Sequence, residues 1–152
     1  MNKFVKLLAG IGVAGFLAGG ALAAEKATKD EAVALVKKGV AHLKAAGKDK
    51  AFADFNNRGG AFVDRELYLT VFDLSGRQIA HGANEKLIGK DLSALKDADG
   101  KEFVKEFVAT AKGPGKGWVD YKWPNPSTKV IEAKSTYVER VDDVLVGAGI
   151  YK

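Results

Sequence analysis

The sequence predicts an α+β domain in which a long N-terminal helix packs on a curved antiparallel sheet of about five strands. Two patterns support this fold. Apolar residues recur at spacings of three and four early in the chain, as in an amphipathic helix. Short runs rich in β-branched and aromatic residues, separated by turn residues, fill the later part. Because short turns join consecutive strands, we expect these strands to be antiparallel.

The long helix is expected over about residues 29–46. Thr28 and Glu31 have the spacing of a capping box, in which the hydroxyl and the carboxylate each accept a backbone N–H. Gly47 is a suitable stop for this helix. A short second helix is expected over residues 49–55. The apolar stripe of the long helix consists of Val33, Val36, Val40 and Leu43.

The sheet and a further helix are expected over residues 62–152. A second helical stripe over about residues 101–112 separates an early hairpin from a three-stranded meander. We expect the long helix on one face of the sheet, and the short helix and loops over the other face, which forms a cup for a small ligand. The expected strands are 68–72, 78–81, 117–123, 130–138 and 144–151.

The N-terminus has the layout of a secretory signal peptide over residues 1–23. Lys3 and Lys6 precede an uncharged apolar run that ends in small residues, and we expect cleavage between Ala23 and Ala24. The alternative is an uncleaved anchor, for which the glycine-rich run is short. Removal of these 23 residues from the 152 leaves one domain of 129 residues, 24–152, exported to the periplasm.

Composition excludes several classes of function. Loss of the two signal-peptide lysines lowers the net charge from +5 to +3, with no basic stripe, so nucleic acid is not an expected partner. Cysteine is absent, which excludes disulfides, c-type haem and iron–sulfur clusters. His42 and His81 are far apart, so we expect neither a metal site nor a cofactor. No nucleophile, base and orienting group share a recognisable context, so we do not expect an enzyme.

Four runs in the second half of the chain resemble single Cache domains of bacterial sensors, and they occur in the family's order. The resemblance covers residues 52–152. The runs are YLTVFDLSGRQIAHGANEKLIGKDL, DADGKEFVKEF, GWVDYKWPNP and EAKSTYVERVDDVLVGAGIYK. Cache domains are extracytoplasmic relatives of the PAS fold. The resemblance therefore implies a PAS-like module that binds short organic acids such as acetate, propionate, lactate or pyruvate, in chemosensing or signal transduction.

Two departures from the family bear on this implied role. The chain ends at Lys152 without a second membrane helix or a signalling domain, so we expect a stand-alone exported member. Its implied partner is a membrane sensor kinase, a chemoreceptor or a transporter. Gly82 follows His81 where many relatives have proline.

The alternative function is a structural or protein-interaction accessory of a membrane sensor or transporter, with no small ligand.

The resemblance implies a ligand site built around Lys134 and Tyr137, which form the family's Lys-x-x-Tyr run. The ammonium of Lys134 would pair with the ligand carboxylate through a charge-assisted bond. Simple alternation along a strand puts these two side chains on opposite faces, so both line one pocket only if a bulge or twist intervenes. The sequence leaves this question open.

Further candidates come from neighbouring strands. Tyr121 and Trp123 are two residues apart, so they share a face and offer an apolar wall with polar tips. His81 ends a strand and would sit at the pocket rim, with a protonation state that depends on pH near 6.5. Tyr68 and Phe62 are weaker candidates, as core or lid residues.

Overall fold

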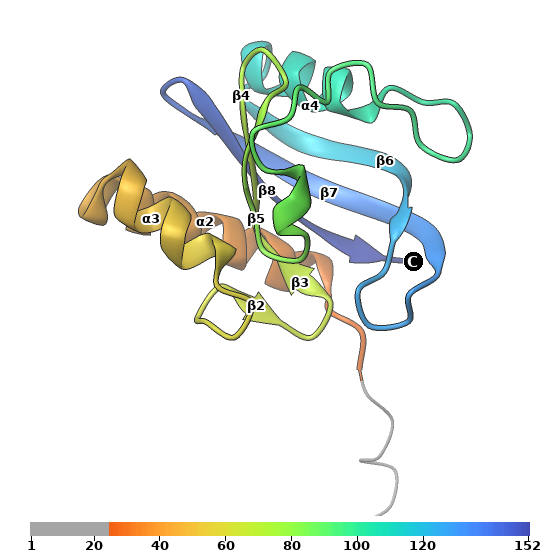
Figure 1. Cartoon of the computed structure of the whole chain (residues 1–152), viewed down its shortest axis with the longest axis horizontal. Helices are drawn as coiled ribbons and strands as arrows, with labels where there is room; N and C mark the ends of the chain where they lie inside the picture. The colour runs from red at the N-terminus through yellow and green to blue at the C-terminus, as the bar shows by residue number, and fades with distance from the viewer. Residues whose placement is uncertain (1–24) are drawn as a thin grey trace, which may run out of the picture.

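The computed structural model of the protein describes residues 25–152, which form helices and an antiparallel sheet (Figure 1). The predicted signal peptide lies outside these described residues. Within them, no helix combines the length and the apolar character that crossing a membrane requires. The elements are α2 (Lys29–Ala46), α3 (Lys48–Asn56), β2 (Val63–Asp64), β3 (Leu67–Tyr68), β4 (Thr70–Asp73), β5 (Gln78–His81), the 3-10 turn η3 (Glu85–Leu87), α4 (Phe103–Lys112), β6 (Lys116–Pro124), β7 (Ile131–Val141) and β8 (Val144–Tyr151).

The five-stranded sheet has the order β5-β4-β8-β7-β6, and every neighbouring pair is antiparallel. The early hairpin of β4 and β5 joins the later meander through pairing of β4 with β8. This arrangement confirms the predicted α+β fold with five antiparallel strands. Strands β2 and β3 form a separate two-stranded ribbon below the sheet, which the sequence did not predict (Figure 1).

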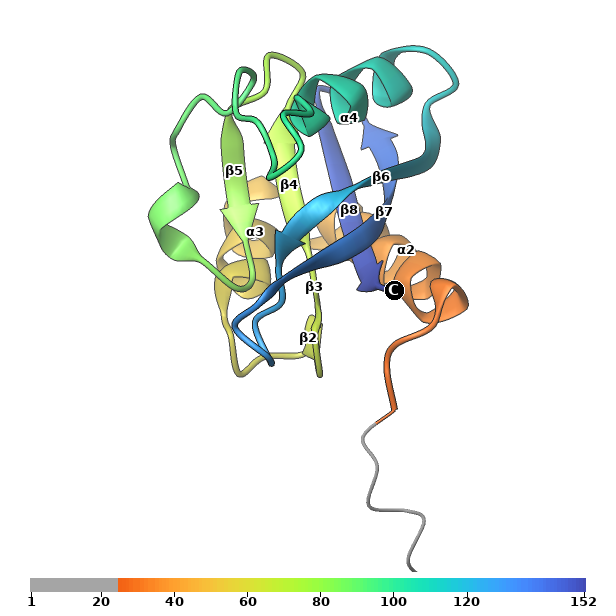
Figure 2. The ribbon, with the colours of Figure 1, turned by 90° about the vertical axis from the view of Figure 1, so that its right-hand side faces the viewer.

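Helices cover both faces of the sheet, but not as predicted. Helix α3 lies beside α2 on one face, and α4 covers the other (Figures 1 and 2). The prediction that the short helix covers the opposite face was therefore wrong. The reason is the single residue Gly47 between the two helices, which keeps α3 next to α2. Ala51 and Phe55, one turn apart on α3, are both fully buried in the same core as α2.

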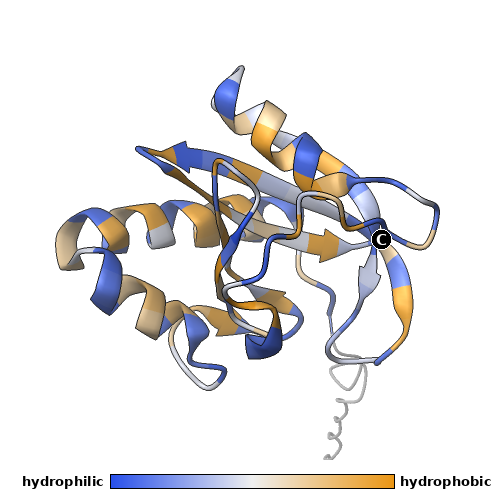
Figure 3. Cartoon of the chain, turned by 45° about the horizontal axis from the view of Figure 1, so that its top comes forward, coloured by the Kyte–Doolittle hydropathy of each residue, from blue (hydrophilic) through white to orange (hydrophobic). Residues whose placement is uncertain are grey.

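Each face has its own hydrophobic core. The core under α2 and α3 includes Val36, Phe55 and Val146, and the core under α4 includes Phe107, Val138 and Leu145. Figure 3 shows hydrophobic and hydrophilic residues interspersed along the helices, as expected when only one side of each helix is buried. Strand β8 contributes to both cores because its side chains alternate between the faces.

Helix α2 begins with the predicted capping box. Thr28 Oγ1 accepts the backbone N–H of Glu31 at 3.1 Å, and Glu31 Oε1 accepts that of Thr28 at 2.9 Å. Thr28→Ala removes one of these bonds and is expected to lower the free energy of unfolding by about 0.5–2 kcal/mol. Urea denaturation measures this change. An unchanged midpoint would show that the cap does not contribute to stability.

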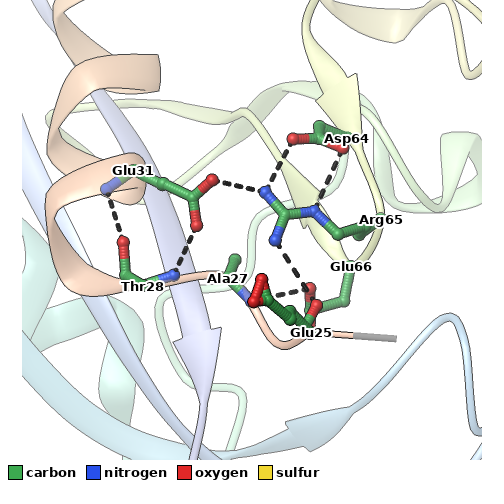
Figure 4. Close-up of polar contacts among 7 residues, drawn as sticks. All are labelled: Glu25, Ala27, Thr28, Glu31, Asp64, Arg65 and Glu66. Atoms are coloured by element: carbon green, nitrogen blue, oxygen red, sulfur yellow. Dashed lines mark hydrogen bonds and ion pairs between the residues drawn. The ribbon is translucent and has the colours of Figure 1, made fainter. Parts of the chain in front are cut away.

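The segment before α2 is held against the β2–β3 ribbon by a group of charged residues (Figure 4). Arg65, with a left-handed φ of 58°, donates to Glu31 Oε2 at 2.5 Å, to Asp64 Oδ2 at 2.8 Å and to the backbone oxygen of Glu25 at 3.4 Å. The guanidinium lowers the pKa of both carboxyl groups through hydrogen bonds. The buried Glu66 accepts the N–H of Ala27 at 3.2 Å. These contacts fix where the chain enters α2.

Candidate ligand-binding site

A small cavity lies between α4 and the sheet, on the face opposite α2 and α3. Its walls come from β3, β4, β5, β6, β7 and α4. The cavity has a volume of about 20 Å³, close to the space that one buried water needs. Five of the seven predicted site residues line it or reach its edge. They are Tyr68, His81, Tyr121, Trp123 and Lys134.

Lys134 is the buried cation of this cavity, with 3% of its surface exposed. Its Nζ donates to Tyr68 Oη at 2.8 Å and lies 4.3 Å and 4.7 Å from the ring centroids of Tyr68 and Tyr151. Among the described residues, no acidic side chain lines the cavity. Burial without a counter-ion lowers the pKa of Lys134 to about 7. Among residues 25–152, the ammonium therefore has N–H donors without a protein acceptor and no acidic partner.

Tyr137 lies on the other face of the sheet. Strand β7 pairs with β6 and β8 in constant register from Ile131 to Val141, so no bulge intervenes between Lys134 and Tyr137. Plain alternation then sends the two side chains to opposite faces. Tyr137 packs against Trp118 and donates to Glu139 Oε1 at 3.1 Å.

Phe62 is also remote from the cavity. It packs in the core under α2 and α3, edge-on to Phe55 with ring centroids 4.9 Å apart. The structure therefore groups five of the predicted site residues and places Tyr137 and Phe62 elsewhere.

His81 is neutral, contrary to the prediction of a rim residue that titrates near pH 6.5. Its Nδ1 accepts the backbone N–H groups of Asn84 at 2.8 Å and Ala83 at 3.1 Å, which assigns the proton to Nε2. Burial, followed by the charges of Lys134 and Arg58, lowers the pKa of His81 to about 3. The side chain is 4% exposed, and its ring centroid is 4.8 Å from that of Tyr68. His81 thus offers the cavity an N–H donor at any physiological pH.

A bulge does occur in the sheet, but between β4 and β5. Thr70 pairs with His81 and Val71 with Ala80, whereas Phe72 pairs with Gln78, so one residue of β5 is unpaired. Gln78 and His81 are three apart and would face opposite sides of a regular strand. The bulge brings both to the cavity.

An aromatic wall closes the side of the cavity under α4. Tyr121 stacks on Phe103 with centroids 4.4 Å apart and planes at 8°, and Trp123 meets the same ring edge-on at 5.3 Å. Tyr121 Oη is hydrogen-bonded to Thr136 Oγ1 at 3.0 Å. The predicted Tyr-x-Trp pair therefore forms this wall together with Phe103 and Phe107 of α4, which lie on the predicted helical stripe of residues 101–112.

A glycine on β8 makes room for the buried lysine. Gly149 lies on the cavity face, directly behind Lys134 and Thr136. A Cβ at this position would lie 2.7 Å from Lys134 Cε, 2.2 Å from Thr136 Oγ1 and 2.8 Å from the backbone oxygen of Ser135. The side chain of Lys134 thus occupies space that only glycine leaves.

No group of three or more metal-ligating side chains occurs within residues 25–152. The polar groups that converge on the cavity are instead hydrogen-bond donors and one amide. Such a donor-rich, largely apolar enclosure suits a small anion better than a cation.

Comparison with known proteins identifies the family. The family model "Single Cache domain 2" matches residues 21–152, which is most of the chain. The chain belongs to the single Cache domain 2 family. This confirms the resemblance seen in the sequence.

Two curated relatives are similar to part of this Cache chain. The methyl-accepting chemotaxis protein McpP of Pseudomonas putida is 37% identical over 90 residues, 58% of this chain and 16% of that protein. The sensor histidine kinase MctS of Rhizobium johnstonii is 37% identical over 89 residues, 57% of this chain and 19% of that protein. The matched part therefore spans less than a fifth of either relative. Both relatives are signalling proteins.

Solved structures of sensor domains share the fold. A periplasmic sensor domain of a chemotaxis protein has a TM-score of 0.63 and 32% identity, covering 80% of this chain and 88% of its own. A methyl-accepting chemotaxis protein from Vibrio parahaemolyticus has a TM-score of 0.70 and 25% identity, covering 81% and 87%. A Cache chemosensory domain described as recognising carboxylic acids has a TM-score of 0.68 and 28% identity, covering 80% and 91%.

Proposed function

We propose that this Cache protein binds a short monocarboxylate, of the acetate, propionate, lactate or pyruvate type, in the cavity around Lys134. The observation that carries the proposal is a buried ammonium with no acidic side chain lining its cavity among the described residues. A bound carboxylate would supply the missing counter-ion. The likeness to a carboxylic-acid-recognising Cache domain supports the same ligand class.

The donors of the cavity suit two carboxylate oxygens. Lys134 has three N–H bonds, of which one goes to Tyr68. His81 contributes Nε2–H because its Nδ1 is occupied by backbone donors. The hydroxyl of Tyr68 accepts from Lys134 and holds its Nζ at the cavity. The aromatic wall of Tyr121 and Trp123 would contact the short alkyl part.

The cavity must widen to admit such a ligand, because about 20 Å³ holds little more than one water. The smallest acids require the least widening. A ligand of about five heavy atoms has a ceiling of roughly 7 kcal/mol, so we expect micromolar or weaker dissociation constants. The same small volume favours the second candidate function, an accessory protein that contacts a membrane sensor or transporter and holds no small ligand.

Export and signalling complete the proposal. We place the protein in the periplasm after removal of residues 1–23, where it presents its ligand to a membrane sensor kinase, chemoreceptor or transporter and catalyses no reaction. The intact mass of the periplasmic protein tests cleavage between Ala23 and Ala24. Retention of Met1 with membrane association would indicate an anchor instead.

A thermal-shift screen tests ligand binding. The screen contains monocarboxylates of two to four carbons and, as a matched control, amines of the same carbon number. We expect carboxylates alone to raise the melting temperature, because binding to the folded state stabilises it by an amount that grows with the logarithm of ligand concentration above the dissociation constant. No shift with any carboxylate at millimolar concentration would favour the accessory function.

A further inference from the structure

Gln78 has a buried side-chain oxygen that accepts no hydrogen bond from the described part of the chain. The side chain is 1% exposed and lines the cavity at the start of β5. Its Nε2 donates to Thr70 Oγ1 at 2.7 Å and to the backbone oxygens of Ala80 at 2.6 Å and Val71 at 3.0 Å. Both carbonyls can only accept, so the orientation of the amide is fixed. Within residues 25–152, no hydrogen bond reaches Oε1 of Gln78.

This oxygen differs in kind from the other polar groups around it. Lys134 and His81 present N–H donors to the cavity. Thr70 accepts from Gln78, which leaves its own hydroxyl proton as a further donor. Among the described lining residues, Gln78 therefore supplies an amide oxygen that can only accept, beside groups that offer N–H or O–H donors. A buried acceptor without a donor is unfavourable, and a ligand that brings a donor removes this cost.

We propose that Gln78 makes the cavity selective for short 2-hydroxy acids, such as lactate and glycolate, over acids without a hydroxyl group. The inference rests on the proposed function, since it requires a carboxylate at Lys134. The carboxylate would be held by Lys134 and His81, and the 2-hydroxyl would donate to Gln78 Oε1. Pyruvate has the same number of heavy atoms as lactate but an acceptor at this position, so it would leave the amide oxygen unpaired.

Calorimetric titration of the protein with lactate (each enantiomer), pyruvate and propionate tests the selectivity. We expect one enantiomer of lactate to bind about tenfold more tightly than pyruvate or propionate, the effect of one hydrogen bond to a buried group. Gln78→Met keeps a side chain of similar length without the acceptor. In this variant the pyruvate-to-lactate ratio of dissociation constants is expected to fall from about ten to about one.

The outcomes separate the claim that a carboxylate binds in the cavity from the claim that Gln78 selects 2-hydroxy acids. If lactate, pyruvate and propionate bind the wild-type protein equally, the selectivity is wrong and the carboxylate site stands. If no carboxylate binds, the proposed function fails and the selectivity with it. A lactate preference that persists in Gln78→Met assigns the hydroxyl to another residue and overturns the role of Gln78. Because the ratio is taken within one variant, a loss of stability does not mimic a loss of selectivity. If Gln78→Met does not fold, the wild-type ligand series still decides whether the cavity prefers 2-hydroxy acids, and equal binding of lactate and pyruvate overturns the proposal.

Discussion

Lys134→Met is expected to weaken monocarboxylate binding by about ten- to a hundredfold and, at the same time, to make the ligand-free protein more stable. Binding is lost because the charged donor is removed. Stability rises because Lys134 is 3% exposed with no acidic partner lining its cavity among the described residues, and methionine fills a similar volume without a charge. Replacements of buried ionic groups by apolar ones suggest a gain of up to about 1–4 kcal/mol near neutral pH. Calorimetry measures the first effect and urea denaturation the second.

The pH dependence of stability provides a check within the same pair of proteins. The pKa of Lys134 is about 7 in the folded protein, below its usual value of 10.5, so the unfolded state binds more protons between these values. Wild-type stability should therefore rise with pH from about 7 to about 10, and this contribution should be absent in Lys134→Met.

Tyr137→Phe is the matched control on the same strand but the opposite face, and it should keep wild-type binding. A Lys134→Met protein that is less stable at pH 7 would contradict the account.

Gly149→Ala is expected to destabilise the protein by about 1–3 kcal/mol and to abolish carboxylate binding. The added Cβ would come within 2.8 Å of the backbone oxygen of Ser135, which cannot rotate away, and within 2.7 Å of Lys134 Cε. The lysine must then leave its place between Tyr68 and Tyr151. Chemical denaturation and calorimetric titration measure the two effects.

Gly59→Ala is the control for this substitution. The added Cβ would have only Asn57 Oδ1 nearby, at 3.9 Å, and this glycine is exposed with an ordinary φ. It should change neither stability nor binding. Wild-type behaviour of Gly149→Ala itself would mean that β8 can shift and that the glycine is not required for the position of Lys134.

The fold was predictable because its signals are local. The capping box at Thr28 and the apolar stripe that follows predicted α2 with its observed bounds, and strand periodicity predicted the five strands. The β2–β3 ribbon was missed because each strand has only two residues, too few for a periodic pattern. The position of α3 was mispredicted because the packing of a short helix depends on its neighbours in space, here on how Gly47 connects it to α2.

The site was only partly predictable, because burial and register decide it. The sequence nominated Lys134 and Tyr137 through family resemblance and left open whether a bulge brings both to one face. The constant register of β7 with β6 and β8 separates them. The contribution of Gln78 depends on a bulge between β4 and β5 that leaves no clear mark in the sequence. The neutral state of His81 depends on two backbone N–H groups and on deep burial, which only the folded chain supplies.

The central claim is that a carboxylate binds to the charged form of Lys134. The most direct test is calorimetric titration of the wild-type protein with one short acid at pH 6 and at pH 9. His81 stays neutral and the pKa values of Tyr68, Tyr121 and Tyr151 are raised, so Lys134 is the cavity group that titrates in this range. Because its pKa is about 7 without ligand, the account predicts binding up to about a hundredfold weaker at pH 9, with proton uptake on binding. Equal affinity at both pH values, without proton uptake, would contradict it.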